Sequence, residues 1–138
     1  MKHVLSVIGT GYLGATHATC MASLGYTVVG VDSDREKIAR LSRGELPFYE
    51  PGLEDLLREQ LATGRLTFSS DFSDLSDADV HFICVGTPQR INSLAADLSY
   101  VEGAVESMTP FLKPGSLVVG KSTVPVGTAE ALSKKLVA

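Results

Sequence analysis

Short apolar runs alternate along this chain with longer segments in which apolar residues recur every three or four positions. The short runs are typical of buried strands, and they cover residues 3–8, 27–31, 66–69, 80–85 and 117–120. The longer segments predict helices, which run from the glycines at 9–14 to Leu24, from 33–36 to Gly44, from Pro51 to Gly64, over 99–112 and over 128–137, with a short helix or turn at 71–77. This alternation predicts an α/β fold, a doubly wound parallel sheet with right-handed crossovers and strand order 3-2-1-4-5.

Polar residues and prolines mark where the two middle helices begin. Residues 33–36 read Ser-Asp-Arg-Glu, a capping box that predicts a helix start with Ile38 and Leu41 facing inward. Pro51 suits the first turn of the next helix. Its expected apolar stripe consists of Leu53, Leu56, Leu57 and Leu61.

The first strand leads directly into Gly9-Thr10-Gly11-Tyr12-Leu13-Gly14, a G-x-G-x-x-G turn that opens a helix. In this context Gly9 permits the tight turn, Gly11 lets a pyrophosphate approach the backbone, and Gly14 lets the helix pack closely on the strand. The helix N-terminus offers unpaired N–H groups and the positive end of its dipole to the phosphates. The pattern therefore predicts a dinucleotide site, whereas a lone glycine motif without these flanking elements would be weak evidence.

Asp32 ends the second strand, where a carboxylate can accept hydrogen bonds from a ribose diol. The same charge would repel a 2′-phosphate, so the sequence favours NAD over NADP. Arg35 is close enough to argue for NADP, but Asp32 comes first, at the end of the strand. The alternative is an ordinary strand, turn and helix without a ligand, which leaves the coincidence of the glycines and the acid unexplained.

Two further loops are expected at the same edge of the sheet as the glycine turn. Residues 86–88 follow the fourth strand and residues 122–123 follow the fifth. Ligands of such sheets bind beyond the carboxyl ends of the strands. The hydroxyls of Thr87 and Thr123 could bond a ribose, a nicotinamide amide or a water, or they could satisfy only the local backbone of a turn.

Composition supports one globular domain of 138 residues, with 44% hydrophobic and 20% charged residues. The net charge is −4 and no basic stripe occurs, so neither nucleic acid nor an anionic membrane is expected as a partner. The N-terminal apolar run stops at Gly9, which indicates a strand and not a signal peptide. With only two cysteines there is no disulfide framework, and a cytoplasmic location is expected.

The cysteines and histidines do not form a second reactive group in the sequence. Cys20 falls in the first helix and Cys84 in the fourth predicted strand, so both are predicted to be buried and inert. His3, His17 and His81 lack metal-ligand spacing, and no metal site is predicted.

Five segments together resemble the NAD-binding domain of the UDP-glucose/GDP-mannose dehydrogenase family, most closely its members that oxidise UDP-glucose. They are the glycine turn with Tyr12, the Asp32 to Lys37 segment, Leu46–Leu53, Val85–Pro88 and Lys121–Thr128. The resemblance covers essentially the whole chain, and the last three segments are more specific than the glycine turn. The chain departs from the family at Gln89-Arg90 and in the loop 91–96.

The resemblance implies that the intact enzyme oxidises UDP-glucose to UDP-glucuronate by two hydride transfers to NAD, with a thioester formed on a cysteine. It implies that Lys37 helps to hold the adenosine ribose and that Thr123 supports catalysis by positioning a water or a substrate hydroxyl. The expected NAD-binding residues are Gly9, Gly11, Tyr12, Leu13, Gly14, Asp32, Lys37, Thr87 and Thr123.

The nucleophilic cysteine, the sixth strand and the substrate domain are expected beyond Ala138, so residues 1–138 should bind NAD without catalysing the reaction. The intact enzyme is expected to be a homo-oligomer and the fragment a monomer. A GDP-mannose or UDP-N-acetylmannosamine dehydrogenase remains an alternative, as does a non-catalytic NAD-sensing module. Two interpretations stay open for Glu50 and Tyr49: a helix cap and a packing residue, the former favoured for Glu50, or a flap beside the cofactor.

Overall fold

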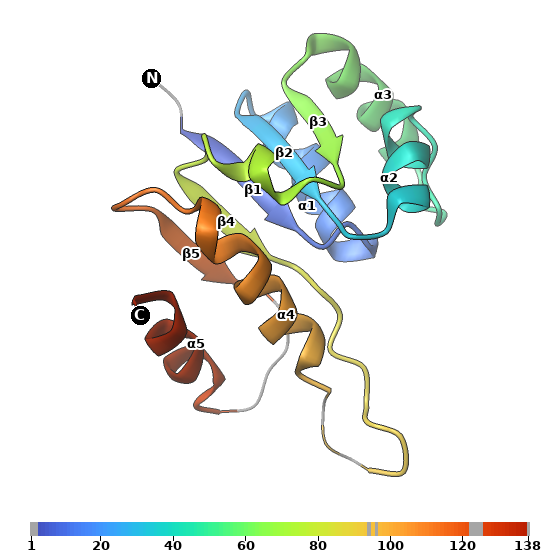
Figure 1. Cartoon of the computed structure of the whole chain (residues 1–138). Coiled ribbons are helices and arrows are strands. Elements are labelled where there is room, and N and C mark those ends of the chain that lie inside the picture. The colour runs from blue at the N-terminus through green and yellow to red at the C-terminus, as the bar shows by residue number, and fades with distance from the viewer. Residues whose placement is uncertain (1–2, 94, 96, 122–125, 138) are drawn as a thin grey trace.

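The computed structural model describes residues 3–93, 95, 97–121 and 126–137. The fold is a five-stranded parallel sheet with order β3-β2-β1-β4-β5 (Figure 1), which confirms the predicted class and strand order. The elements are β1 Val4–Ile8, α1 Tyr12–Ser23, β2 Thr27–Val31, α2 Arg35–Ser42, α3 Leu53–Thr63, β3 Leu66–Ser69, the 3-10 helix η1 Phe72–Leu75, β4 Val80–Ile83, α4 Ser99–Met108, the 3-10 helix η2 Thr109–Phe111, β5 Leu117–Gly120 and α5 Thr128–Val137.

The strand register aligns the carboxyl ends of the three central strands. Ile8 of β1 lies beside Val31 of β2 on one side and beside Ile83 of β4 on the other. These strands are nearly continuous apolar runs because helices cover both faces of a parallel sheet. The loops that leave β1, β2 and β4 therefore start side by side, and this arrangement positions the site described below.

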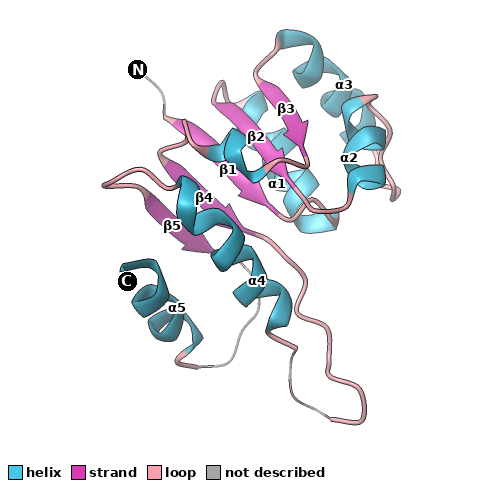
Figure 2. Ribbon diagram, in the orientation of Figure 1, coloured by secondary structure: helices cyan, strands magenta, loops and turns pink. Residues whose placement is uncertain are grey.

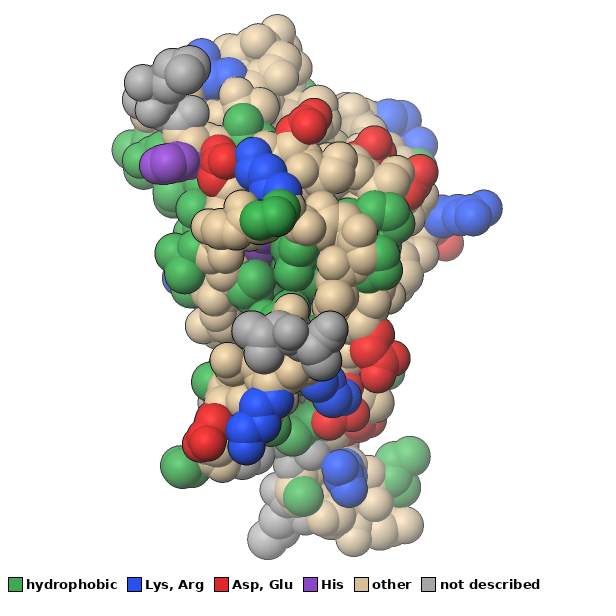
Figure 3. Space-filling model, turned by 60° about the vertical axis from the view of Figure 1, so that its left-hand side comes forward, with side chains coloured by type: hydrophobic (Ala, Val, Ile, Leu, Met, Phe, Trp, Pro, Cys, Tyr) green, Lys and Arg blue, Asp and Glu red, His purple; other side chains and the backbone are tan. Residues whose placement is uncertain are grey.

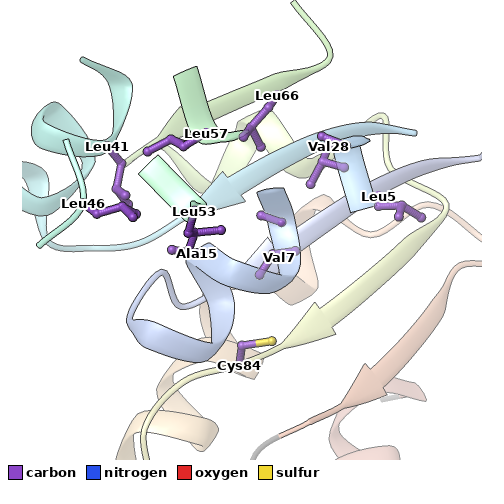
Figure 4. Packing of buried hydrophobic residues seen from close by; sticks show 12 residues of the cluster. Leu5, Val7, Ala15, Val28, Leu41, Leu46, Leu53, Leu57, Leu66 and Cys84 are labelled. Atoms are coloured by element: carbon purple, nitrogen blue, oxygen red, sulfur yellow. The ribbon is translucent and has the colours of Figure 1, made fainter. Parts of the chain in front are cut away.

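Two apolar clusters pack on opposite faces of the sheet. On one face, Leu5 and Val7 of β1 belong to a cluster with residues of α1 and α3, and Figure 4 shows Ala15 beside Val7 and Leu53 in this cluster. On the other face, Ile8 and Ile83 pack under α4, which lies in front of the sheet in Figure 2 while α1 lies behind it. Residues of α5 add to the second cluster.

The outer face of α1 differs from the sequence prediction. The helix buries small residues, Ala15, Ala18 and Ala22, so that its backbone can lie close to the sheet. The larger residues on the opposite side point away, and Leu24 is 62% exposed. The expectation that Cys20 is buried is therefore wrong, because it lies on this exposed side, whereas Cys84 is buried as predicted.

Three element boundaries shift by one or more residues. β4 ends at Ile83 instead of residue 85, and α4 gives way after Met108 to η2. The start of α2 is capped by Asp34, whose carboxylate accepts a hydrogen bond from the Lys37 N–H at 3.1 Å. The predicted cap at Ser33 is wrong by one position. The Asp34 N–H donates to the Asp32 carboxylate at 3.0 Å, so Asp34 itself is the residue that flanks the helix and caps it.

β5 pairs only with β4 among the described strands, so its other edge has no strand partner. Its side chains are less covered than those of the central strands, and Leu117 is 58% exposed. Figure 3, which brings this side of the molecule forward, shows hydrophobic side chains on the surface there.

Candidate functional site

A crevice of about 870 Å³ opens at the carboxyl edge of the sheet, between the neighbouring parallel strands β1 and β4, where the strand order reverses. It is lined by the glycine turn, the end of β2, the loop that follows β4 and one side of α4. This is where ligands bind in doubly wound α/β folds, and the volume suits a cofactor-sized molecule.

The three glycines of the turn have the geometry that the sequence predicts for them. Gly9 has φ +93°, and a Cβ there would lie 2.8 Å from the Val85 backbone nitrogen. A Cβ on Gly14 would lie 1.7 Å from the Gly9 carbonyl oxygen. In contrast, a Cβ on Gly11 would meet nothing within 4 Å. Two glycines are thus required by packing, and the third faces open space, which leaves room for a phosphate at the backbone.

The N-terminus of α1 has no side-chain cap and no acidic residue in its first turn. By comparison, Asp34 caps α2, and α3 carries Glu54 and Asp55 in its first turn. The first N–H groups of any helix lack partners within the helix, and here neither a side-chain cap nor an acidic residue of the helix's own first turn compensates for them. The first turn of α1 is therefore suited to an anion that comes from outside the protein.

Asp32 sits at the end of β2 as the acceptor of a compact hydrogen-bond network. Its Oδ2 accepts from the Thr10 N–H at 2.9 Å, from the Thr10 hydroxyl at 3.0 Å and from the Lys37 ammonium at 3.3 Å. Burial by itself would raise the pKa of this carboxyl, but the Asp34 and Thr10 N–H groups, the Lys37 charge and the Thr10 hydroxyl outweigh it and hold the pKa below its usual value. Asp32 is therefore ionised at neutral pH.

One oxygen of this carboxylate remains suited to a ligand. Oδ1 accepts from the Asp34 N–H at 3.0 Å, and a carboxylate oxygen can accept about two hydrogen bonds. Asp32 and Lys37 both line the crevice, and Lys37 is placed there by the first turn of α2. The pair offers an acceptor and a donor to a ribose diol, and the carboxylate opposes an added phosphate.

The loops after β4 and β5 are only partly within the described structure. Thr87 lines the crevice as predicted. Ser122 and Thr123 lie outside the described residues, so the role expected for Thr123 stays a prediction. Lys121, just before them, also lines the crevice and was not anticipated from the sequence.

One side of α4 is the part of the site that the sequence analysis missed. Ser99, Gly103 and Ser107 line the crevice, together with Tyr100. Their spacing of four residues places small side chains along one face of a helix, and this is the signal that could have identified them. Small residues on this face keep the crevice open.

Glu50 and Tyr49 do not act as the sequence suggested. The N-cap of α3 is Gly52, with no side-chain cap, so Glu50 does not cap the helix. Instead, its carboxylate accepts a hydrogen bond from the Tyr12 hydroxyl at 2.7 Å, beside the glycine turn. Tyr49 is 87% exposed, which is against the first of its two interpretations, that it packs.

Among the described residues, the buried cysteine and the histidines that pack in the interior show no arrangement for catalysis or metal binding. Burial raises the pKa of the Cys84 thiol to about 11, which disfavours the reactive thiolate. His81 pairs with Ser6 through Nδ1 at 2.6 Å in the core, and the His17 ring packs edge-on against Phe82. Within the described part of the chain, no group of three His, Cys, Asp or Glu residues could hold a metal ion.

Within the residues that the structure describes, no helix has the length and apolar character needed to cross a membrane.

Among curated proteins, the UDP-glucose 6-dehydrogenase of Pseudomonas aeruginosa is 50% identical over 131 residues, which are 94% of this chain and 29% of that protein. The chain thus spans about 30% of the length of this relative and of the UDP-glucose 6-dehydrogenase of Rhizobium meliloti.

Two solved structures share the fold closely. The UDP-glucose dehydrogenase of Pyrobaculum islandicum is 39% identical with a TM-score of 0.88, over 99% of this chain and 33% of that chain. The UDP-D-ManNAc dehydrogenase of Pyrococcus horikoshii is 36% identical with a TM-score of 0.91, over 96% of this chain and 31% of that chain. Residues 3–138 match the NAD binding domain of the UDP-glucose/GDP-mannose dehydrogenase family, and the chain, with its dinucleotide crevice, belongs to this family.

Proposed function

We propose that this chain is the cofactor-binding domain of an NAD-dependent enzyme that oxidises UDP-glucose to UDP-glucuronate. The observation that carries the proposal is the crevice, in which an open Gly11, an uncapped helix N-terminus and the ionised Asp32 follow adjacent strands. These features fit the pyrophosphate and the adenosine ribose of a dinucleotide. Bound NAD would supply the hydride acceptor.

In this proposal, each part of the crevice has a distinct task. The turn around Gly11 and the first turn of α1 bind the pyrophosphate through backbone N–H groups. Asp32 accepts hydrogen bonds from the ribose diol, with Lys37 beside it as a donor. The loop with Thr87 and the small residues of α4 border the side of the crevice that extends toward β5, where the nicotinamide half would lie.

Titration calorimetry with NAD and NADP on the wild type, Asp32→Ala and Asp32→Asn tests the assignment of Asp32. A hydrogen bond to a charged group contributes about 1.5–3 kcal/mol, so Asp32→Ala should weaken NAD binding about ten- to a hundredfold. Asp32→Asn keeps an acceptor but loses the charge, so it should mainly reduce the preference for NAD over NADP.

Asp71→Ala is the matched control, because it removes an acid that caps η1 and does not line the crevice. It should leave NAD affinity unchanged. Equal NAD affinity in the wild type and in Asp32→Ala would refute the role of Asp32.

The sugar substrate is the finer part of the proposal, and the Pseudomonas aeruginosa relative supports UDP-glucose. GDP-mannose and UDP-N-acetylmannosamine are the alternatives within the family. We further propose that residues 1–138 bind NAD but form no NADH from a nucleotide sugar by themselves, and that the intact enzyme is a homo-oligomer in which further segments supply the sugar pocket and the nucleophile.

An absorbance assay for NADH with UDP-glucose, GDP-mannose and UDP-N-acetylmannosamine tests the substrate. It compares residues 1–138 with a longer protein that includes the following domain. Oxidation of UDP-glucose by the longer protein alone supports the proposal, whereas sugar-dependent NADH formation by residues 1–138 would refute the division of tasks between the domains.

A further inference from the structure

The loop between α2 and α3 is attached to the glycine turn by two contacts of Tyr12, the first residue of α1. The Tyr12 hydroxyl donates a hydrogen bond to Glu50 Oε2 at 2.7 Å. The Tyr12 ring packs against Phe48 with ring centroids 4.9 Å apart at an angle of 51°. Neither contact is required to form a helix, and together they join segments that are distant in the sequence.

Glu50 is held firmly enough to act as an anchor. The Glu50 carbonyl accepts a hydrogen bond from the Leu53 N–H at 3.2 Å, where α3 begins. Leu46 before it and Leu53 after it are both buried in the core, and Phe48 packs against the same cluster. The loop is thus anchored on both sides of Glu50, and this holds the Glu50 backbone near Tyr12.

The sign of the charge makes this contact unexpected. Tyr12 lines the crevice, at the helix end suited to a pyrophosphate, and Glu50 places a negative charge close to it. A carboxylate there opposes the binding of an anion by simple electrostatics. The hydrogen bond to Glu50 and the Glu50 charge raise the pKa of the Tyr12 phenol, so the hydroxyl remains a donor at neutral pH.

We propose that Glu50 is a positioning residue for the cofactor, which holds Tyr12 and with it the first turn of α1 in the orientation that binds the pyrophosphate. The inference rests on NAD binding in the crevice, as proposed above. The N–H groups of this turn are the ligand donors, and no side-chain cap fixes them. Because Tyr12 is the first residue of the helix, restraint of its side chain also restrains these donors.

Simple repulsion by Glu50 predicts the opposite set of effects, which makes the inference testable. If Glu50 acts only as a negative charge, Glu50→Ala and Glu50→Gln should both tighten NAD binding and Tyr12→Phe should do nothing. If Glu50 positions Tyr12, loss of the hydrogen bond should weaken binding from either side, while Glu50→Gln retains an acceptor for the Tyr12 hydroxyl.

The experiment measures the Kd of NAD by calorimetry for Tyr12→Phe, Glu50→Ala, Glu50→Gln and the double variant Tyr12→Phe/Glu50→Ala. Loss of one hydrogen bond should weaken binding about two- to tenfold in each of the first two variants. Glu50→Gln should stay within about twofold of the wild type, because its amide oxygen can accept the same bond. The double variant should lose no more than either single variant, since both remove the same contact.

Adenosine, which lacks the pyrophosphate, separates positioning of the turn from a general loss of structure. Its affinity, followed by chemical shift changes, should be equal in all the variants, so that only the ratio of NAD to adenosine affinity changes. Glu54→Ala is the matched control, because Glu54 lies nearby in the first turn of α3 but pairs with Arg58 at 2.6 Å and does not line the crevice. It should bind NAD as the wild type does.

The results distinguish the two levels of the argument. A wild type that does not bind NAD would refute the proposed function itself. A wild type that binds NAD, with variants that bind equally well, bind more tightly or lose NAD and adenosine affinity in parallel, would refute the positioning role of Glu50.

Discussion

The tightest backbone contact of the glycine turn leads to a quantitative prediction for Gly14→Ala. The added Cβ would lie 1.7 Å from the Gly9 carbonyl oxygen and 3.3 Å from the Cys84 Cβ. Carbon atoms need about 3.5 Å from such neighbours, so α1 and the turn would have to separate by more than about 1 Å. Gly9 cannot retreat easily, because its N–H donates to the Val31 carbonyl at 2.9 Å and its Cα faces the Val85 backbone.

The magnitude follows from two opposing effects. Overpacking of this kind costs about 1–3 kcal/mol and sometimes more, and a contact with backbone belongs at the upper end of the range. Alanine is a better helix former than glycine by about 1 kcal/mol, which offsets part of the cost. We expect Gly14→Ala to lower the free energy of unfolding by about 2 kcal/mol, which shifts the urea midpoint down by about 1 M.

Urea unfolding of Gly14→Ala and of Gly103→Ala measures the effect against a matched control. Gly103 is also inside a helix, α4, but a Cβ there would meet nothing within 4 Å. The same substitution should therefore raise the free energy of unfolding by about 0.5–1 kcal/mol at Gly103. If the two variants were equally stable, the close packing of α1 on the turn would not be the reason for a glycine at position 14.

Three further predictions concern the turn, the buried histidines and the thiols. Gly11→Val should abolish NAD binding with an unchanged circular dichroism spectrum, because the side chain fills the space left for the phosphate; retained binding would place the phosphate elsewhere. Burial lowers the pKa of His81, and burial together with the charge of Lys121 lowers that of His17. Below about pH 6.5 both histidines therefore take up protons more readily in the unfolded chain than in the native state. The free energy of unfolding should therefore fall from pH 7 to pH 5, and less so in His81→Gln; an equal fall in both proteins would contradict this assignment for His81. A thiol reagent should label exposed Cys20 in the native state and buried Cys84 only after denaturation, whereas rapid labelling of Cys84 would show that it is accessible.

The sheet and its order could be predicted because each strand is a short apolar run bounded by residues that end it. The prediction for α1 was wrong, because Cys20 was expected to be buried and lies on the exposed side. Sequence apolarity favours burying the largest residues, but the close approach at Gly14 places small residues against the sheet instead. The short distance between the α1 backbone and the glycine turn decides which side of α1 faces inward. The pattern of apolar residues along the helix does not reveal this distance.

The candidate site was predictable where its parts are close in sequence and less so where they are distant. The glycine turn and Asp32 belong to one continuous strand, turn, helix and strand. The hydrogen bond between Tyr12 and Glu50 joins residues on different helices and loops, and only the packing of α3 against α1 brings them together. The small residues of α4 are also distant in sequence from the glycine turn, and the packing of α4 on the other face of the sheet brings them to the crevice.

The network around Asp32 has a consequence for how cofactor preference could change over time. The carboxylate accepts hydrogen bonds from the Thr10 N–H and hydroxyl, the Asp34 N–H and the Lys37 ammonium. Replacement by a small neutral residue would remove the repulsion of a 2′-phosphate but would leave these donors without their acceptor, at a cost for each one that is not rehydrated. A lineage that shifts toward NADP would therefore also have to change the residues around Asp32 in the turn, β2 and α2, so that these donors find new acceptors. The local structure thus limits the substitutions by which the preference for NAD could be lost.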